Sequence, residues 1–118
     1  MKLVIPGEFP TLNEIIKASK SHPMAYANMK KDYTTLTMIH ANKLPKLKHV
    51  DIEFTWYCKN KRKDKDNIAF GIKFILDGMI EARVIANDGW GEIANFEHRF
   101  EVDKDCPRIE IELEEAEC

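Results

Sequence analysis

A strict alternation of apolar and polar side chains over residues 49–58 constrains the fold of this chain more than any other feature. The apolar members are Val50, Ile52, Phe54, Trp56 and Cys58, and acidic or polar residues lie between them. Successive side chains of a β-strand point to opposite faces, so the pattern predicts a strand with one buried face and one solvated face. The protein must therefore contain a sheet that is covered mainly on one side.

Three further segments are predicted to be strands. Residues 3–5 form a short apolar run that Pro6-Gly7 ends. Residues 94–101 alternate in the same way after the turn signal Asn87-Asp88-Gly89, and apolar residues alternate with glutamates over 109–113.

Helical periodicity occupies the remaining segments. Residues 11–14 match a capping box, and Pro23 closes the helix that follows them. A second helix, with apolar residues at helical spacing from Tyr26 to His40, ends before Pro45. A third begins with Asp66 or Asn67 as its cap and has an apolar stripe over 68–79. We expect Gly78 to mark its C-terminal end, with residues 79–80 as an alternative extension.

These elements predict one α+β domain over residues 1–118. Its order is β-α-α-β-α-β-β, and its helices pack on one face of a small, mixed, four-stranded sheet. A chain of this length can bury one modest core.

The segment between the strand at 50–58 and the third helix combines two opposite charges. Asp64 and Asp66 lie within the basic residues Lys59, Lys61, Arg62, Lys63 and Lys65, and Asn67 follows. In an extended backbone alternate side chains share a face, so both carboxylates can point the same way. Carboxylates bind a hard cation such as Mg²⁺, and lysine and arginine bind phosphate. The combination predicts metal-assisted phosphodiester chemistry.

Simpler interpretations of the same residues stay open. The aspartates can be ordinary helix caps, and the basic run can be a solvated loop. A calcium-binding EF-hand loop is excluded, because Ile68 and Ala69 stand where that loop needs an oxygen ligand and a glycine.

Two carboxylates bind Mg²⁺ weakly, so a third acid is expected. Asp88, in the turn before the next strand, is the best candidate, although Asn-Asp-Gly can also be only a turn. Asp77 lies about 15 Å along the predicted helix from Asp66, too far to share a metal. Lys73 on that helix is a candidate for contacting the scissile phosphate, or else an ordinary surface lysine. Trp56 is expected in the core, and Tyr57 is freer to stack on a base.

Composition limits the alternatives. The net charge is −2, so any nucleic-acid surface must be a local patch, offset by the acidic residues near the C-terminus. The three cysteines, Cys58, Cys106 and Cys118, are an odd number without close pairing, which is typical of a reducing compartment. They form no CxxC pair, which argues against a thiolate metal site. With no signal peptide or membrane span in the sequence, we expect a cytoplasmic protein.

The block Lys63-Asp64-Lys65-Asp66-Asn67, with Lys73 and Asn87-Asp88 downstream, resembles the RusA family of Holliday junction resolvases, which prophages often carry. The resemblance covers most of the chain, and the D-x-D-N block is its specific part. It implies a homodimeric, Mg²⁺- or Mn²⁺-dependent endodeoxyribonuclease that resolves four-way DNA junctions by paired symmetric nicks, in DNA recombination and repair.

By resemblance, Asp64, Asp66 and Asp88 are the metal ligands and Lys73 is the catalytic lysine. The basic residues 59–65 and Asn67 are the expected nucleic-acid contacts. Two departures stand out: Phe70 occupies the place where the family often has its lysine, and Asn87 replaces the first member of an Asp-Asp pair. The alternatives are a metal-dependent nuclease for another branched or duplex nucleic acid, or a non-catalytic DNA-binding module.

Overall fold

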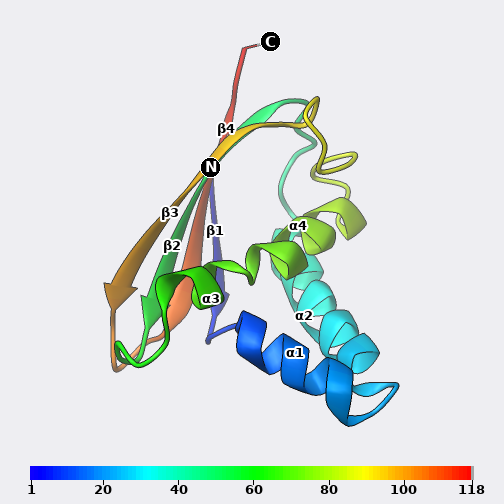
Figure 1. Cartoon of the computed structure of the whole chain (residues 1–118). Coiled ribbons are helices and arrows are strands. Elements are labelled where there is room, and N and C mark those ends of the chain that lie inside the picture. The colour runs from blue at the N-terminus through cyan, green and yellow to red at the C-terminus, as the bar shows by residue number, and fades with distance from the viewer. Residues whose placement is uncertain (118) are drawn as a thin grey trace.

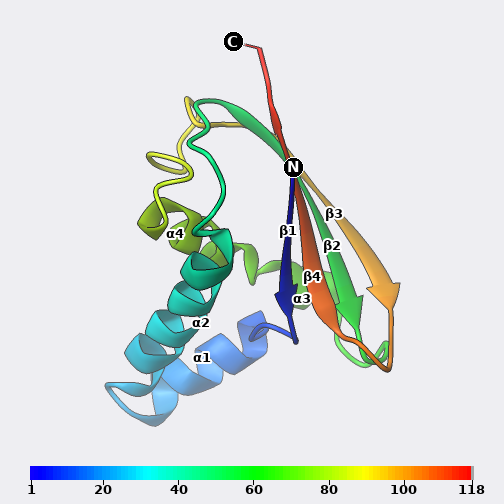
Figure 2. The same cartoon turned by 180° about the vertical axis from the view of Figure 1, so that it is seen from behind.

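Four strands form one mixed sheet in the order β1-β4-β2-β3 in the computed structural model, which describes residues 1–117. The strands are β1 (Lys2–Pro6), β2 (Val50–Cys58), β3 (Ile93–Val102) and β4 (Arg108–Glu115). β4 pairs antiparallel with both β1 and β2, whereas β3 pairs parallel with β2. The helices α1 (Leu12–Ser21), α2 (Ala25–Ala41), α3 (Lys65–Ala69) and α4 (Ile72–Glu81) lie on one side of the sheet (Figures 1 and 2). The predicted α+β class and element order are confirmed.

The core lies between the sheet and the helices. One face of β2 and β4 buries Ile52, Phe54 and Trp56 beside Ile109 and Ile111. From the helical side, α4 contributes Phe74, Ile75 and Met79, all fully buried. The predicted strand over 49–58 is therefore confirmed, with one face against the core and the other toward solvent.

The start of α1 is as predicted. Thr11 accepts a hydrogen bond from the backbone N–H of Glu14, and the Glu14 side chain accepts one from the Thr11 N–H, which completes a capping box. The cap fixes Glu14 near the loop that follows β2, a contact that matters for the candidate site.

The prediction for the third helix was wrong in two respects. The predicted single helix is broken at residues 70–71 into α3 and α4, where the backbone of Gly71 approaches the Trp56 indole; a Cβ there would lie 3.1 Å from it. The N-cap is Asp64, not Asp66 or Asn67, and its side chain makes no capping hydrogen bond. Asp64 is extended, so the helix starts at the next residue and Asp66 falls in its first turn.

Gly78 does not end the helix: α4 continues to Glu81, so the alternative extension through residues 79–80 is confirmed. Gly78 lies inside α4, where α2 and α4 pack closely. A Cβ at this position would lie 2.4 Å from the Cβ of Thr37 and 2.9 Å from the carbonyl oxygen of Thr34. Only a residue without a Cβ permits this approach.

We expect Gly78→Ala to lower the free energy of unfolding by about 1–3 kcal/mol, because the backbones must separate to admit the methyl group. Gly91→Ala is the matched control, since a Cβ there meets nothing within 4 Å. Urea denaturation of both variants measures the difference. Equal stability of the two variants would contradict the close packing of α2 on α4.

The parallel pairing of β2 and β3 sets the positions of the loops. The chain leaves β2 at one end of the sheet, and α3 and α4 carry it back to the other end before β3 begins (Figure 1). Residues 59–66 therefore lie at one end of the sheet and residues 86–92 at the opposite end.

No helix among residues 1–117 is both long enough and apolar enough to cross a membrane.

Candidate nucleic-acid groove

A groove of about 800 Å³ opens between the loop after β2, the start of α3 and the end of β3. Its polar lining is formed by Asn60, Lys61, Lys63, Asp64, Lys65, Asp66 and Glu101. Its apolar lining is formed by Cys58, Ile68, Phe100 and Val102. The two aspartates thus share one groove with three of the predicted basic residues, whereas Lys59, Arg62 and Asn67 do not line it.

Asp64 and Asp66 are both exposed at the N-terminal end of α3. Among their side-chain oxygens, Oδ1 of Asp66 accepts the N–H of Asn67 at 3.0 Å. Neither aspartate has an ion-pair partner within residues 1–117. Their carboxylates are therefore available to a cation from solution.

Acidic residues near the N-terminus anchor two lysines of the basic run. The Lys63 ammonium donates a hydrogen bond to Oε1 of Glu14 at 3.0 Å, and this bond raises the pKa of Lys63. Partial burial works to raise the pKa of Glu14, but hydrogen bonds from Lys63 and Thr11 outweigh it and lower that pKa. The backbone N–H of Lys59 donates to Oε2 of Glu8 at 3.2 Å. These contacts tie the loop after β2 to the segment that precedes α1.

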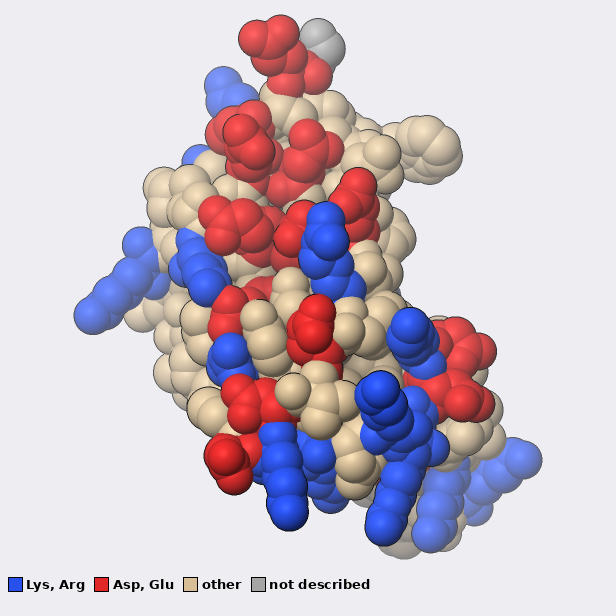
Figure 3. All heavy atoms as spheres, turned by 90° about the vertical axis from the view of Figure 1, so that its left-hand side faces the viewer, with Lys and Arg blue, Asp and Glu red and all other residues tan. Residues whose placement is uncertain are grey.

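The other three cations of the run are free to bind an anion. Lys61, Arg62 and Lys65 are exposed and form no ion pair with the described residues. The Lys65 ammonium lies 5.7 Å from the centre of the Phe100 ring, within reach of a cation–π contact across the groove. Figure 3 shows lysine and arginine side chains gathered at the lower end of the molecule, whereas aspartate and glutamate dominate the upper part of this face.

The structure does not bring Asp88 to the other two aspartates. Asp88 precedes β3, and Asp64 follows β2, so the paired length of these parallel strands, roughly 25 Å at about 3.3 Å per residue, separates them. Figure 1 shows the loop after α4 at the opposite end of the sheet from α3. Within residues 1–117, no group of three or more His, Cys, Asp or Glu side chains is arranged to bind a metal ion. The expectation that Asp88 returns to the start of the helix is therefore wrong for a single chain.

Lys73 also lies outside the groove. Its ammonium is 3.6 Å from Oδ1 of Asp77, one helical turn along α4. Oδ2 of Asp77 is buried and has no hydrogen-bond partner, and the Lys30 ammonium lies 3.9 Å from it. The structure thus places Lys73 with Asp77 and Lys30 at the contact of α4 with α2, and its catalytic role stays a prediction.

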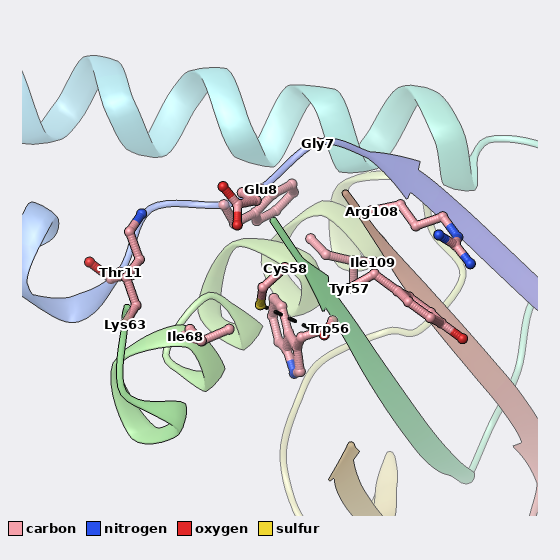
Figure 4. A pocket seen from close by; sticks show the side chains of 11 residues that line it. Gly7, Glu8, Thr11, Trp56, Tyr57, Cys58, Lys63, Ile68, Arg108 and Ile109 are labelled. Atoms are coloured by element: carbon pink, nitrogen blue, oxygen red, sulfur yellow. Dashed lines mark hydrogen bonds between the residues drawn. The ribbon is translucent and has the colours of Figure 1, made fainter. Parts of the chain in front are cut away.

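Trp56 and Tyr57 point to opposite sides of β2, as Figure 4 shows. Trp56 is 2% exposed, so the expectation that it belongs to the core is confirmed. Tyr57 is covered on the open face, because the Arg108 guanidinium lies 3.7 Å from the centre of its ring. Arg108 would have to move before a base could stack there.

Sequence reasoning missed the apolar wall of the groove. Phe100 belongs to the predicted strand over 94–101 and Val102 follows that strand directly, but the alternating pattern does not say which strand lies beside it. Their place in the groove follows from the parallel pairing with β2, which sets Trp56 opposite Phe100 and Cys58 opposite Val102.

Comparison with known proteins adds no assignment: no family model matches the chain, and no curated protein matches it.

Proposed function

We propose that the protein is a metal-dependent endodeoxyribonuclease that resolves four-way DNA junctions by paired symmetric nicks. The observation that supports the proposal is the groove in which Asp64 and Asp66 lie among unpaired cations. The same residues form the D-x-D-N block on which the resemblance to the RusA resolvases rests.

The cations bind the DNA backbone in this proposal. Lys61 and Lys65 line the groove and Arg62 stands beside them, so phosphates of a strand in the groove find positive charge near both carboxylates. Such contacts hold a strand without selecting its sequence. Lys63 and Lys59, tied to Glu14 and Glu8, keep the loop in place.

Asp64 and Asp66 fit part of a Mg²⁺ site. They offer hard oxygen ligands, and Mg²⁺ in proteins keeps several waters and takes substrate phosphate as a further ligand. When bound, such an ion polarises the phosphate and lowers the pKa of a coordinated water. Mn²⁺ is the expected substitute. A single chain, over its described residues 1–117, does not provide the third carboxylate.

A second copy of the chain is the economical source of that carboxylate. Two symmetric cuts at a junction already favour a two-fold dimer with one site per chain. If the two-fold axis passes beside β3, the β3 strands of the two copies run in opposite directions. The start of β3 in one copy then lies beside the end of β3 in the other copy. We therefore propose that Asp88 of one chain completes the site that holds Asp64 and Asp66 of its partner.

Replacing Lys61 and Lys65 together by alanine is expected to weaken binding to junction DNA. The slope of log K against log salt should fall by about 0.9 for each phosphate that the variant no longer neutralises. Fluorescence anisotropy at several salt concentrations measures both quantities. Lys31→Ala, which removes an exposed lysine of α2 outside the groove, is the control and should leave the slope unchanged. An unchanged slope in the double variant would exclude this groove as the DNA-binding surface.

One alternative, a DNA-binding module without catalytic activity, is favoured by the lack of a three-acid cluster among residues 1–117 of one chain. In that case Asp64 and Asp66 only occupy the N-terminal end of α3 and bind no metal ion. Cleavage by the wild type that Asp66→Asn abolishes would favour the nuclease, whereas DNA binding without cleavage by the wild type would favour the module.

A further inference from the structure

β3 is a long edge strand with a partly uncovered apolar face. It has ten residues, and β2 is its neighbour on one side only. Its residues Phe96 and Val102 are each 47% exposed, although they stand opposite Ile52 and Cys58, which are buried. The helices cover β2 but do not reach across β3 (Figures 1 and 2). An open edge of this length is a ready site for pairing with another strand.

We propose that two copies of this chain associate through β3, edge to edge and antiparallel, with His98 of each copy on the two-fold axis. The dimer itself belongs to the proposed function, and this inference, which rests on it, names the interface. The two sheets then form one continuous sheet.

The charges of β3 select this register. With His98 on the axis, Glu97 stands directly opposite the partner's Arg99, and symmetry creates the same pair a second time. Opposite charges across an antiparallel pair are favourable, and like charges are unfavourable. A shift that sets Glu97 on the axis places it opposite the partner's Glu97. A shift that sets Arg99 on the axis places two arginines together.

The side chains are free to make these pairs. Glu97 and Arg99 are both exposed. Nε of Arg99 already lies 3.1 Å from Oε1 of Glu53 in an ion pair, and the terminal N–H groups of Arg99 remain for a second carboxylate. The Glu53 contact holds the Arg99 side chain on the open face of the sheet, where Glu97 also lies.

The apolar face of β3 is complementary in the same register. Phe96 stands opposite the partner's Phe100, so the interface gains two aromatic pairs. His98 is stacked between the rings of Phe54 and Phe100, at 5.1 and 6.3 Å, and its Nδ1 accepts the indole N–H of Trp56. Burial lowers the pKa of His98, so the residue on the axis is neutral near pH 7.

The register also determines what lies near the groove. The partner's Ile93 falls opposite Asp103, just beyond the end of β3, so the loop before Ile93 reaches the end of the sheet that holds the groove. That loop contains Asp88 and Trp90, whose side chain is 98% exposed.

Charge exchange tests the interface by light scattering and sedimentation, without DNA or metal. The wild-type chain should have about twice the monomer mass of 13.7 kDa. Glu97→Arg and Arg99→Glu each set like charges together twice, so the dimer dissociation constant should rise at least about tenfold in each variant. An equimolar mixture of the two variants restores both opposite pairs and should form heterodimers. Glu101→Arg is the matched control, because the partner's neutral Asn95 stands opposite it.

Each outcome decides the proposal. A monomeric wild-type chain, two variants as dimeric as the wild type, or a mixture that stays monomeric would overturn it. Equal weakening by Glu101→Arg would overturn the register. Thermal melting of each variant by circular dichroism shows that the chains are folded. Because association is measured without cleavage, the interface can fail while nuclease activity is found, and nuclease activity can fail while the interface is confirmed.

Discussion

The variant Asp66→Asn is expected to cleave four-way junctions at least about a thousandfold more slowly than the wild-type protein. The substitution removes one of two carboxylates that face the groove and leaves the fold intact, since an asparagine oxygen can still accept the N–H of Asn67. Junction binding should be retained or tighter, because a negative charge near the phosphates is gone. A gel assay with labelled junction in Mg²⁺ measures cleavage, and binding is measured in EDTA.

Asp32→Asn is the matched control for this change, since it removes an exposed aspartate of α2 outside the groove. It should cleave and bind like the wild type. Cleavage that survives Asp66→Asn would exclude Asp66 as a catalytic group and would contradict the proposed metal site.

The second large effect is complementation between two inactive chains. Asp66→Asn and Asp88→Asn should each be inactive alone. When equal amounts of the two variants are mixed under conditions that exchange subunits, half of the dimers are heterodimers. If Asp88 acts across the dimer, each heterodimer has one site with all carboxylates intact and one with two substitutions. The mixture should then recover about a quarter of the wild-type rate of single nicks.

A single-chain site gives the opposite result, because every site in the mixture would carry one substitution and cleavage would stay at the background of the separate variants. The nicking of a labelled strand should be scored, not full resolution, since a heterodimer can cut only once before it dissociates. Loss of activity in Asp66→Asn together with full activity in Asp88→Asn would remove Asp88 from the site altogether.

Local patterns in the sequence predicted most of the fold. The alternation over 49–58 and the capping box at Thr11 describe contacts within a few residues, and both have the predicted structure. The break at Gly71 was not predictable from local pattern, because the backbone there packs closely against the indole of Trp56, a residue distant in sequence. Gly78 was misassigned for a similar reason: the residue that requires a glycine there is Thr37 of another helix.

The part of the candidate site that lies within one short segment of the sequence was also predictable, whereas the part that depends on long-range strand pairing was not. Asp64, Asp66 and their neighbouring lysines are adjacent in sequence, so one loop places them in one groove. The position of Asp88 depends on the direction in which β3 pairs with β2, a long-range property that the turn signal Asn-Asp-Gly does not contain. Lys73 was assigned by resemblance, and its partner Asp77 sits one turn along the same helix.

The most direct test of the proposed function is a cleavage assay with the wild-type protein on a four-way junction, a linear duplex and a single strand, each with and without Mg²⁺. The account predicts paired, symmetric nicks in the junction that require Mg²⁺, with little cleavage of the other two substrates. Preferential cleavage of the duplex would contradict junction resolution while leaving a nuclease. Absence of Mg²⁺-dependent cleavage on all three substrates would contradict the proposed catalytic function itself.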